Sequence, residues 1–454
     1  MKKLLYFLSI NMLWLSSCSI NKKISKQANQ TILSDSNFIS AEAQKTILSD
    51  SNFLPAHVGI SIYDPSTKQY LYNYQGDKYF IPASNMKLFT CYAAMKNLGD
   101  SLVGLKYLIS EKNAAVFFQP TGDPTFLHSD FKSQPVVDFL KKDTSLFKIL
   151  VPAKNNFNQF GRGWAWDDYL SGYMAERSSF PIYGNVIRLA VNNKRLLMVP
   201  KLPMEYGGNN DYSEWFANKA DSYSYTRNRS SNKILWDTSN TKFTKDETPF
   251  ITSYSTSIDF LKDTIQGLKI GIGKSSPTLT NVIYSQPTDS LLKITMHRSD
   301  NFFAEQTLLM VSNEKLGVMN DRAIIDTLLS TDFKSLPQKP KWVDGSGLSR
   351  YNLITPQDFI WVLSKMKEEF KWERIATILP TGNEGTLAGL YKNYAGKIYA
   401  KTGTLSNHVA LSGYITTNKG RQLIFSILVN NHQTSASNIR RTIEKFLIEL
   451  METN

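Results

Sequence analysis

An alternating segment near the amino end of the chain and two apolar segments near the carboxy end predict the strands of one sheet. Residues 57–63 alternate, a polar turn follows, and residues 69–74 continue as a second strand. Towards the other end, residues 411–415 and 423–429 are apolar segments joined by a polar turn. Two hairpins of an antiparallel sheet are therefore expected. The segment containing Lys401 adds a further strand, which we expect to be an inner strand of this sheet.

Helical periodicity lies between these strands. Residues 86–98 form an apolar segment that ends at Gly99, and residues 289–297 have a second helical pattern. With 454 residues, 42% of them hydrophobic and 20% charged, the chain can bury a large core and is expected to contain two or three domains. The predicted fold class is mixed α/β (α+β), with an antiparallel sheet flanked by helices.

A short apolar segment near the amino terminus has the features of a signal peptide. Lys2 and Lys3 precede apolar residues 4–15, which are too few to span a hydrocarbon core of about 30 Å. The segment ends in Leu15-Ser16-Ser17-Cys18, which is similar to the lipobox of bacterial lipoproteins. We expect residues 1–18 to be a lipoprotein signal peptide with Cys18 as the lipidated residue. The alternative is an ordinary signal peptide that happens to contain a cysteine.

Residues 19–55 are polar and contain a direct repeat. Residues 31–38 recur as residues 46–53. Two copies do not make a solenoid, which needs three or more units. We therefore interpret residues 19–55 as a flexible tether with a root-mean-square span of about 35 Å, long enough to hold a folded domain away from a membrane surface.

Ser84 and Lys87 are the first residues that suggest chemistry. The pattern Ser-x-x-Lys also occurs at seven other serines, but Ser84 lies at the amino end of a predicted apolar helix. Residues three apart share a helix face, so the Lys87 amine can reach the Ser84 hydroxyl. Lysine can act as the base for a serine nucleophile if burial and nearby positive charge, here including Lys401, lower its pKa. The alternative is a helix-capping serine beside a solvated lysine.

Ser299-Asp300-Asn301 is the second candidate motif. It follows the predicted helix over 289–297 and leads into another apolar segment. The Ser299 hydroxyl can relay a proton to a leaving amine, and the Asn301 carboxamide can hold a substrate amide. Serine, aspartate and asparagine are also common in turns and helix caps, which is the alternative interpretation.

Lys401-Thr402-Gly403-Thr404 is the third candidate motif, and it lies on a predicted strand. Lys401 and Thr402 offer a cation and a hydroxyl to a terminal carboxylate. Gly403 is expected to leave room for a substrate along the strand edge. The backbone N–H groups of Thr404 and Ser84 are expected to form an oxyanion hole. The alternative is a surface strand that happens to end in Lys-Thr-Gly.

In this order the three motifs resemble the low-molecular-mass class C penicillin-binding proteins, which are D-alanyl-D-alanine carboxypeptidases and endopeptidases of peptidoglycan metabolism. The similarity extends over nearly everything after residue 56. Further matching strings are Pro82-Ala83-Ser84, Gly122-Asp123-Pro124, Gly163-Trp164-Ala165-Trp166-Asp167-Asp168 and Asp344-Gly345-Ser346-Gly347-Leu348-Ser349-Arg350.

The resemblance implies a β-lactamase/transpeptidase-like catalytic domain with a large β-rich insertion. Ser84 and Ser299 are 215 residues apart, which is more than such a domain needs. Residues 56–106 and 283–454 are expected to form the catalytic domain, and residues 107–282 the inserted domain. The family places a small third domain inside the second, which we expect here near residues 187–245.

The resemblance also implies an activity. Ser84 is expected to form an acyl-enzyme and to hydrolyse peptidoglycan stem peptides or cross-links, with β-lactams as covalent inhibitors and no metal or other cofactor. Asp168 matches the residue that in relatives binds the amino group of a diamino acid in the stem; its alternative role is a helix cap. Asn407 and His408 depart from the family pattern, which leaves the substrate preference open.

The expected location is the periplasmic side of the cell envelope, with a lipid anchor in the outer membrane. The formal net charge of +13 suits a protein that faces an anionic cell wall. Nucleic acid is not an expected partner, because the Lys and Arg residues are scattered without a run of five or more.

Two other functions compete with this interpretation. A class A β-lactamase needs a deacylating Glu between the second and third motifs, but no Glu occurs from Lys315 to Lys367, and the comparable stretch offers only Asp332. A non-catalytic wall-binding lipoprotein would not need Ser84 and Lys87. The five histidines have no metal-ligand spacing, and Cys91 is expected to be a small buried residue of the helix.

Overall fold

The computed structural model describes residues 33–453 apart from 193–194, 208–224, 238–244 and 275–276. The predictions for the signal peptide and for Cys18 fall outside these residues. Among the described residues, none of the helices combines the length and apolar character needed to cross a membrane.

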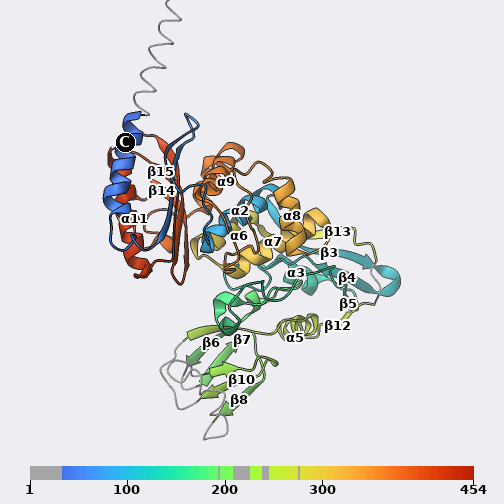
Figure 1. Ribbon diagram of the computed structural model, residues 1–454. Helices are drawn as coiled ribbons and strands as arrows, with labels where there is room; N and C mark the ends of the chain where they lie inside the picture. The colour runs from blue at the N-terminus through green and yellow to red at the C-terminus, as the bar shows by residue number, and fades with distance from the viewer. Residues whose placement is uncertain (1–32, 193–194, 208–224, 238–244, 275–276, 454) are drawn as a thin grey trace, which may run out of the picture.

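The main sheet has five antiparallel strands and joins the two ends of the described chain (Figure 1). The strand order is β14-β15-β16-β1-β2. The strands are β1 (His57–Asp64), β2 (Gln69–Tyr74), β14 (Ile398–Leu405), β15 (His408–Thr416) and β16 (Gln422–Asn430). The two predicted hairpins are therefore present. Strand β14 lies at the edge of the sheet, so its prediction as an inner strand was wrong; strand order depends on distant pairings that a local pattern does not contain.

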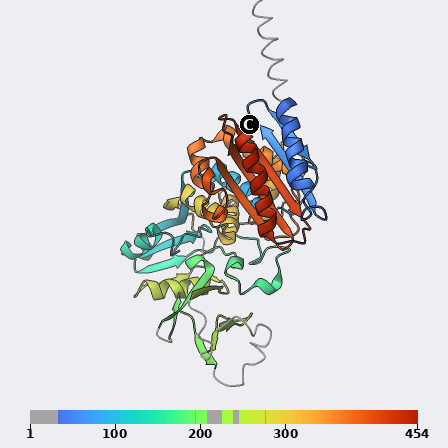
Figure 2. The same ribbon diagram turned by 90° about the vertical axis from the view of Figure 1, so that its left-hand side faces the viewer.

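Helices cover both faces of this sheet, as Figures 1 and 2 show. Along β16, Ile424 and Leu428 pack with helices α2 (Lys87–Asn97) and α9 (Pro356–Glu369). Phe425 and Ile427, on the other face, pack with the carboxy-terminal helix α11 (Ala436–Thr453). Because successive side chains of a strand point to opposite faces, the apolar run of β16 contributes to two cores.

The amino-terminal segment is helical and packed, so the predicted flexible tether was wrong for residues 33–55. Residues 33–43 are α-helical, and the π-helical turn η1 (Gln44–Leu48) follows. Ile39, Ala43 and Ile47 are fully buried in the same apolar cluster as α11. Their spacing of four residues places them on one face of the helix. This stripe is visible in the sequence, but the polar residues around it and the repeat obscured it.

Further helices surround α2 on the inner side of the sheet. Helix α7 begins after Asp300, whose side chain accepts a hydrogen bond from the Phe303 N–H, and it ends at Gly317, which has a φ of 67°. The helices are α6 (Thr288–His297), α7 (Asn301–Leu316), α8 (Asp321–Ser330) and α10 (Trp372–Ile378).

A second five-stranded sheet forms the part inserted after α2, with strand order β12-β5-β4-β3-β13. The predicted domain boundaries at 106 and 283 fall inside β3 and β13, which pair with each other, so the inserted sheet extends beyond both boundaries. Its elements are β3 (Ser101–Ser110), β4 (Ala115–Pro120), β5 (Phe147–Leu150), β12 (Ile270–Ile272) and β13 (Asn281–Pro287), with helices α3 (Pro135–Lys142) and α5 (Tyr254–Thr264).

Two small sheets lie at the end of the molecule farthest from α11 (Figure 2), in the region where the nested third domain was expected. Residues of these sheets, including Ile187 and Ile234, share an apolar cluster with Phe118 of β4. The strands are β6 (Val186–Asn192), β7 (Arg195–Val199) and β11 (Lys245–Pro249) in one sheet, and β8 (Met204–Gly207), β9 (Tyr225–Arg227) and β10 (Ile234–Asp237) in the other.

Shortening a buried side chain of the amino-terminal helical segment should destabilise the protein. Ile47→Ala removes a fully buried side chain, and we expect the free energy of unfolding to fall by about 2–5 kcal/mol. Urea denaturation followed by tryptophan fluorescence measures this change. Leu33, whose side chain is 63% exposed, provides the control, because Leu33→Ala should change stability little. Equal unfolding curves for wild type and Ile47→Ala would mean that this helix does not contribute to the core.

Candidate active site

Ser84 lies in a tight turn beneath the main sheet's edge. The turn is the 3-10 helix η2 (Ala83–Met86), which leads directly into α2. Asn85 is fully buried, and its side-chain amide donates a hydrogen bond to the Ser412 hydroxyl of β15 over 2.7 Å. This contact ties the turn to the sheet and so fixes the position of the Ser84 hydroxyl.

Two glycines let the backbone approach this turn closely. A Cβ on Gly403 of β14 would lie 2.7 Å from the Pro82 carbonyl oxygen and 3.1 Å from the Ser84 nitrogen. Gly347, with a φ of 86°, is pressed against the Ala83 carbonyl from the other side. The space that we expected Gly403 to leave for a substrate is therefore occupied by the Ser84 turn.

Lys87 begins α2 and is fully buried. Its Nζ lies 3.0 Å from Ser84 Oγ, 2.6 Å from Asn301 Oδ1 and 2.7 Å from the Ser346 carbonyl oxygen. Burial lowers the pKa of Lys87 to about 8, against the opposing influence of Asp344, Asp300 and Glu305. A lysine with this pKa is partly neutral near pH 7, as a base for Ser84 requires.

The second motif joins the first through Asn301, the first residue of α7. Its carboxamide oxygen accepts from Lys87, and its amide nitrogen donates to the Tyr173 carbonyl over 3.0 Å. Ser299 has a φ of 61°, which is uncommon for a residue with a side chain. The Arg298 guanidinium next to it pairs with Asp300 and, at 2.7 Å, with Asp130 of the inserted part.

Lys401 joins the third motif to the second. It is fully buried, and its Nζ donates to the Ser299 hydroxyl over 2.9 Å and to the Thr402 carbonyl over 2.7 Å. Burial, then the charges of Lys87 and Arg440, hold the pKa of Lys401 far below its usual value. We expected burial and nearby positive charge, including Lys401, to lower the pKa of Lys87; burial is the main cause for both lysines.

A cleft of about 450 Å³ opens over these motifs. Ser84, Asn301 and Thr404 line one side of it, and the inserted part supplies Asp168 and Tyr173. Asp168 is the last residue of a short 3-10 helix, η4 (Trp166–Asp168), so it does not cap a helix starting at Tyr169. The structure therefore brings together the candidate residues of all three motifs and Asp168.

The sequence left several residues of the site unidentified. The backbone carbonyl of Ser346 accepts a hydrogen bond from Lys87, and that of Tyr173 accepts one from Asn301. Arg440 of α11 donates a hydrogen bond to the Thr404 hydroxyl. A backbone acceptor has no sequence signal, although the matching string that includes Ser346 marked its region. Arg440 had no sequence signal either, because strands β15 and β16 separate it from the third motif along the chain.

Asn407 and His408 do not line the cleft. Asn407 has a φ of 68° in the turn between β14 and β15, and the buried His408 begins β15. Burial lowers the pKa of His408 to about 4.

Asp332 lies away from the cleft. It pairs with Lys96 and accepts a hydrogen bond from Asn97, at the opposite end of α2 from Lys87. Ten residues of helix span about 15 Å, so Asp332 cannot serve as a deacylating carboxylate. Within the part of the chain that the structure describes, no group of three or more His, Cys, Asp and Glu side chains is arranged to hold a metal ion.

Comparison with known proteins assigns the chain to a family. It matches the D-Ala-D-Ala carboxypeptidase 3 (S13) family over residues 41–235 and 261–450. The protein belongs to this S13 family. It is therefore a serine-type hydrolase, and the predicted relation to low-molecular-mass class C penicillin-binding proteins is confirmed.

Two relatives of the S13 protein match over most of their length. D-alanyl-D-alanine carboxypeptidase DacB of Haemophilus influenzae is 24% identical over 438 residues, which cover 83% of this chain and 86% of the relative. Penicillin-sensitive carboxypeptidase A of Dictyostelium discoideum is 23% identical over 463 residues, which cover 86% and 85% of the two chains.

Solved structures confirm the fold class of the S13 protein. Penicillin-binding protein 4 (dacB) from Haemophilus influenzae superposes with a TM-score of 0.71 at 19% identity, covering 91% of this chain and 99% of that chain. The same protein complexed with a β-lactam superposes with a TM-score of 0.64 at 17% identity and the same coverage.

Gly403→Ala should slow acylation by penicillin. The added Cβ would meet the backbone of Pro82 and Ser84 and push the Ser84 hydroxyl away from Lys87. Because a displacement of about 1 Å can cost 10²-fold in rate, we expect the acylation rate constant of the S13 protein to fall by about 10–100-fold. Stopped-flow mixing with a fluorescent penicillin measures it.

Gly271→Ala is the matched control, because a Cβ there would meet nothing within 4 Å. Its acylation rate should equal that of the wild type. If Gly403→Ala also acylated at the wild-type rate, the close approach of β14 to the Ser84 turn would not matter for the reaction.

Proposed function

We propose that the protein hydrolyses D-alanyl peptide bonds of peptidoglycan through an acyl-enzyme on Ser84, as a carboxypeptidase, a cross-link endopeptidase or both. The observation that carries this proposal is the buried Lys87 amine within 3.0 Å of the Ser84 hydroxyl. The lowered pKa of this lysine, at about 8, gives the serine a base that is partly neutral near neutral pH.

Acylation begins when Lys87 takes the proton of the Ser84 hydroxyl. The serine oxygen then forms a bond to the carbonyl carbon of the D-alanyl peptide. The backbone N–H groups of Ser84 and Thr404 stabilise the resulting oxyanion. The close approach of Gly403 to the Ser84 nitrogen supports this pairing, because it places β14 beside the turn.

Collapse of the tetrahedral intermediate breaks the carbon–nitrogen bond. Ser299 passes a proton to the leaving amine, with Lys401, 2.9 Å from its hydroxyl, as the neighbouring proton donor. Lys401 and Thr402 attract the carboxylate of the leaving group, and Asn301 orients the substrate amide. Water then attacks the ester carbonyl and gives a proton back to Lys401 through Ser299. Lys87 returns its proton to the Ser84 oxygen as the ester bond breaks, which releases the shortened peptide and restores both lysines.

Asp168 supplies substrate choice in this proposal. It lines the same cleft as Ser84, and a carboxylate is a suitable partner for the ammonium group of a diamino acid in the stem. Because Asp168 belongs to the inserted part, that part can select the substrate without taking part in the chemistry.

The proposed location is the periplasmic side of the cell envelope, with Cys18 lipidated and anchored in the outer membrane. Peptidoglycan peptides are the proposed substrates, and β-lactams the proposed covalent inhibitors. The β-lactam complex of the related penicillin-binding protein 4 supports the second of these assignments.

Covalent labelling with a fluorescent penicillin tests the nucleophile. The wild type should acquire the label, and Ser84→Ala should lose it while its thermal unfolding stays unchanged. Denaturing gels measure the label, and incubation of the protein with purified muropeptides measures the release of cleavage products. A folded wild type that acquires no label would contradict the proposed acyl-enzyme. A fully labelled Ser84→Ala would show that another residue is the nucleophile.

Asp168→Asn tests the proposed substrate contact. Loss of a charged partner costs about 1.5–3 kcal/mol, so cleavage of a stem peptide with a free diamino acid amine should slow by about tenfold or more. Penicillin lacks that amine, so its acylation rate should remain the same and serves as the control. Equal loss with both compounds would mean that Asp168 only supports the cleft.

A further inference from the structure

The direction of the Lys87 lone pair is set by two fixed acceptors. A neutral amine has two N–H bonds and one lone pair. Asn301 Oδ1 at 2.6 Å and the Ser346 carbonyl oxygen at 2.7 Å can accept the two N–H bonds. The lone pair then points at the remaining neighbour, Ser84 Oγ. The position of the Ser346 carbonyl is therefore part of what makes Lys87 a base for Ser84.

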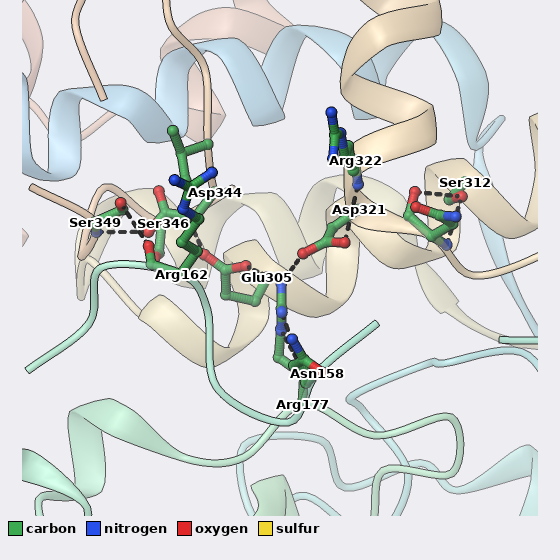
Figure 3. A network of polar contacts seen from close by, with 12 residues as sticks. Asn158, Arg162, Arg177, Glu305, Ser312, Asp321, Arg322, Asp344, Ser346 and Ser349 are labelled. Atoms are coloured by element: carbon green, nitrogen blue, oxygen red, sulfur yellow. Dashed lines mark hydrogen bonds and ion pairs between the residues drawn. The ribbon is translucent and has the colours of Figure 1, made fainter. Parts of the chain in front are cut away.

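The residue that supplies this carbonyl is itself held at its backbone N–H by a carboxylate (Figure 3). Glu305 Oε1 accepts the Ser346 N–H over 2.8 Å. On either side of it, Asp344 Oδ1 accepts the Gly347 N–H over 2.9 Å, and the Thr90 hydroxyl donates to the Gly345 carbonyl over 2.7 Å. Asp344 thus anchors the Ser346–Gly347 peptide, whose carbonyl receives Lys87, and Glu305 and Thr90 anchor the Gly345–Ser346 peptide directly before it.

Glu305 is in a position that ordinary packing does not explain. It follows Asn301 by four residues, so the two side chains lie on one face of α7. It is almost fully buried, and its compensating charge is the Arg177 guanidinium at 3.3 Å, which comes from the inserted part. Figure 3 shows Arg177 reaching Glu305 and Asp321 together. A buried carboxylate is costly unless it has a task or a partner.

We propose that Glu305 is a positioning residue for the acylation base: by holding the N–H of Ser346 it fixes the residue whose carbonyl orients Lys87 towards Ser84. The inference rests on the proposed roles of Ser84 and Lys87. Glu305 does not touch the substrate or the reacting atoms; it acts through the backbone of Ser346, from the peptide group directly before the one that carries the carbonyl. Arg177, which favours the charged form of this carboxyl group, makes the inserted part a contributor to the base as well.

The charge of Glu305 has a separate effect from its hydrogen bond. Asp344, Asp300 and Glu305 each raise the pKa of Lys87, whereas burial lowers it to about 8. The charge of Lys87, after burial, lowers the pKa of the neighbouring Lys401. The Glu305 carboxyl itself is pushed up to a pKa of about 7, by burial and then by Asp344, against Arg177. Removing this negative charge should lower the pKa of Lys87 further.

Two substitutions separate the hydrogen bond from the charge. Glu305→Gln keeps an oxygen for the Ser346 N–H and removes the charge. Glu305→Asp keeps the charge, but its side chain is shorter by one methylene group, so the carboxylate no longer reaches that N–H. Glu314→Gln is the control, because Glu314 lies on the same helix in an exposed pair with Lys106. The measurement is the acylation rate constant of the full chain with fluorescent penicillin between pH 5 and pH 10, with thermal unfolding as the check on folding.

Acylation needs neutral Lys87, so the rate should rise with pH through the pKa of Lys87. In Glu305→Gln the midpoint of this rise should move to lower pH, by about half a unit, with the high-pH rate within about threefold of wild type. In Glu305→Asp the midpoint should stay, and the high-pH rate should fall about tenfold. Glu314→Gln should match wild type in both.

The outcomes distinguish this inference from the proposed function. If wild type is not acylated, the proposed function fails. If wild type is acylated and folded Glu305→Gln and Glu305→Asp both keep its midpoint and its high-pH rate, Glu305 is only a structural residue and the inference fails. A loss of rate in both variants without any change of midpoint in Glu305→Gln would likewise overturn the electrostatic part.

Discussion

The burial of one amino group governs the rest of this structure. Lys87 has no contact with solvent and is surrounded by three oxygens, from Ser84, Asn301 and Ser346. An ammonium group without water is costly, so each oxygen must be held where it can accept a hydrogen bond. The turn on the sheet, the start of α7 and the restrained peptide loop each hold one of them. The three motifs are therefore the visible part of a larger arrangement built around one amine.

The inserted part contributes to this arrangement at several points. Arg177 pairs with Glu305, the Trp164 indole donates to Asp344 over 2.9 Å, and Asp130 pairs with Arg298 beside Ser299. These are polar contacts between segments that lie far apart in the sequence. The insertion therefore supports the catalytic residues directly, in addition to lining the cleft.

The sequence identified the motif residues that the structure brings together, but not the residues that support them. Ser84 with Lys87, and Lys401 with Thr402, are short motifs whose context is local, and the apolar run of β16 was clear enough to predict a hairpin. The edge position of β14 and the contacts of Glu305 depend on pairings between distant segments, which no local pattern contains. The amino-terminal helix was missed because its stripe at Ile39 and Ile47 lies among polar residues. Functional motifs are conspicuous because chemistry restricts residue type, whereas packing partners are restricted only by the final geometry.

The pairing of β1 with β16 has a consequence for biogenesis. Val58 lies opposite Val429 in the sheet, so β16, which follows the β14–β15 hairpin that carries the third motif, closes the sheet against β1. Contacts of such long sequence separation form late in folding. The inserted part, whose strands lie between these segments, can collapse earlier, since domains generally fold as units during synthesis. Ser84 and Lys401 meet only when strand β14 has been added, so the site that contains both residues stays unassembled until this late part of the chain is available.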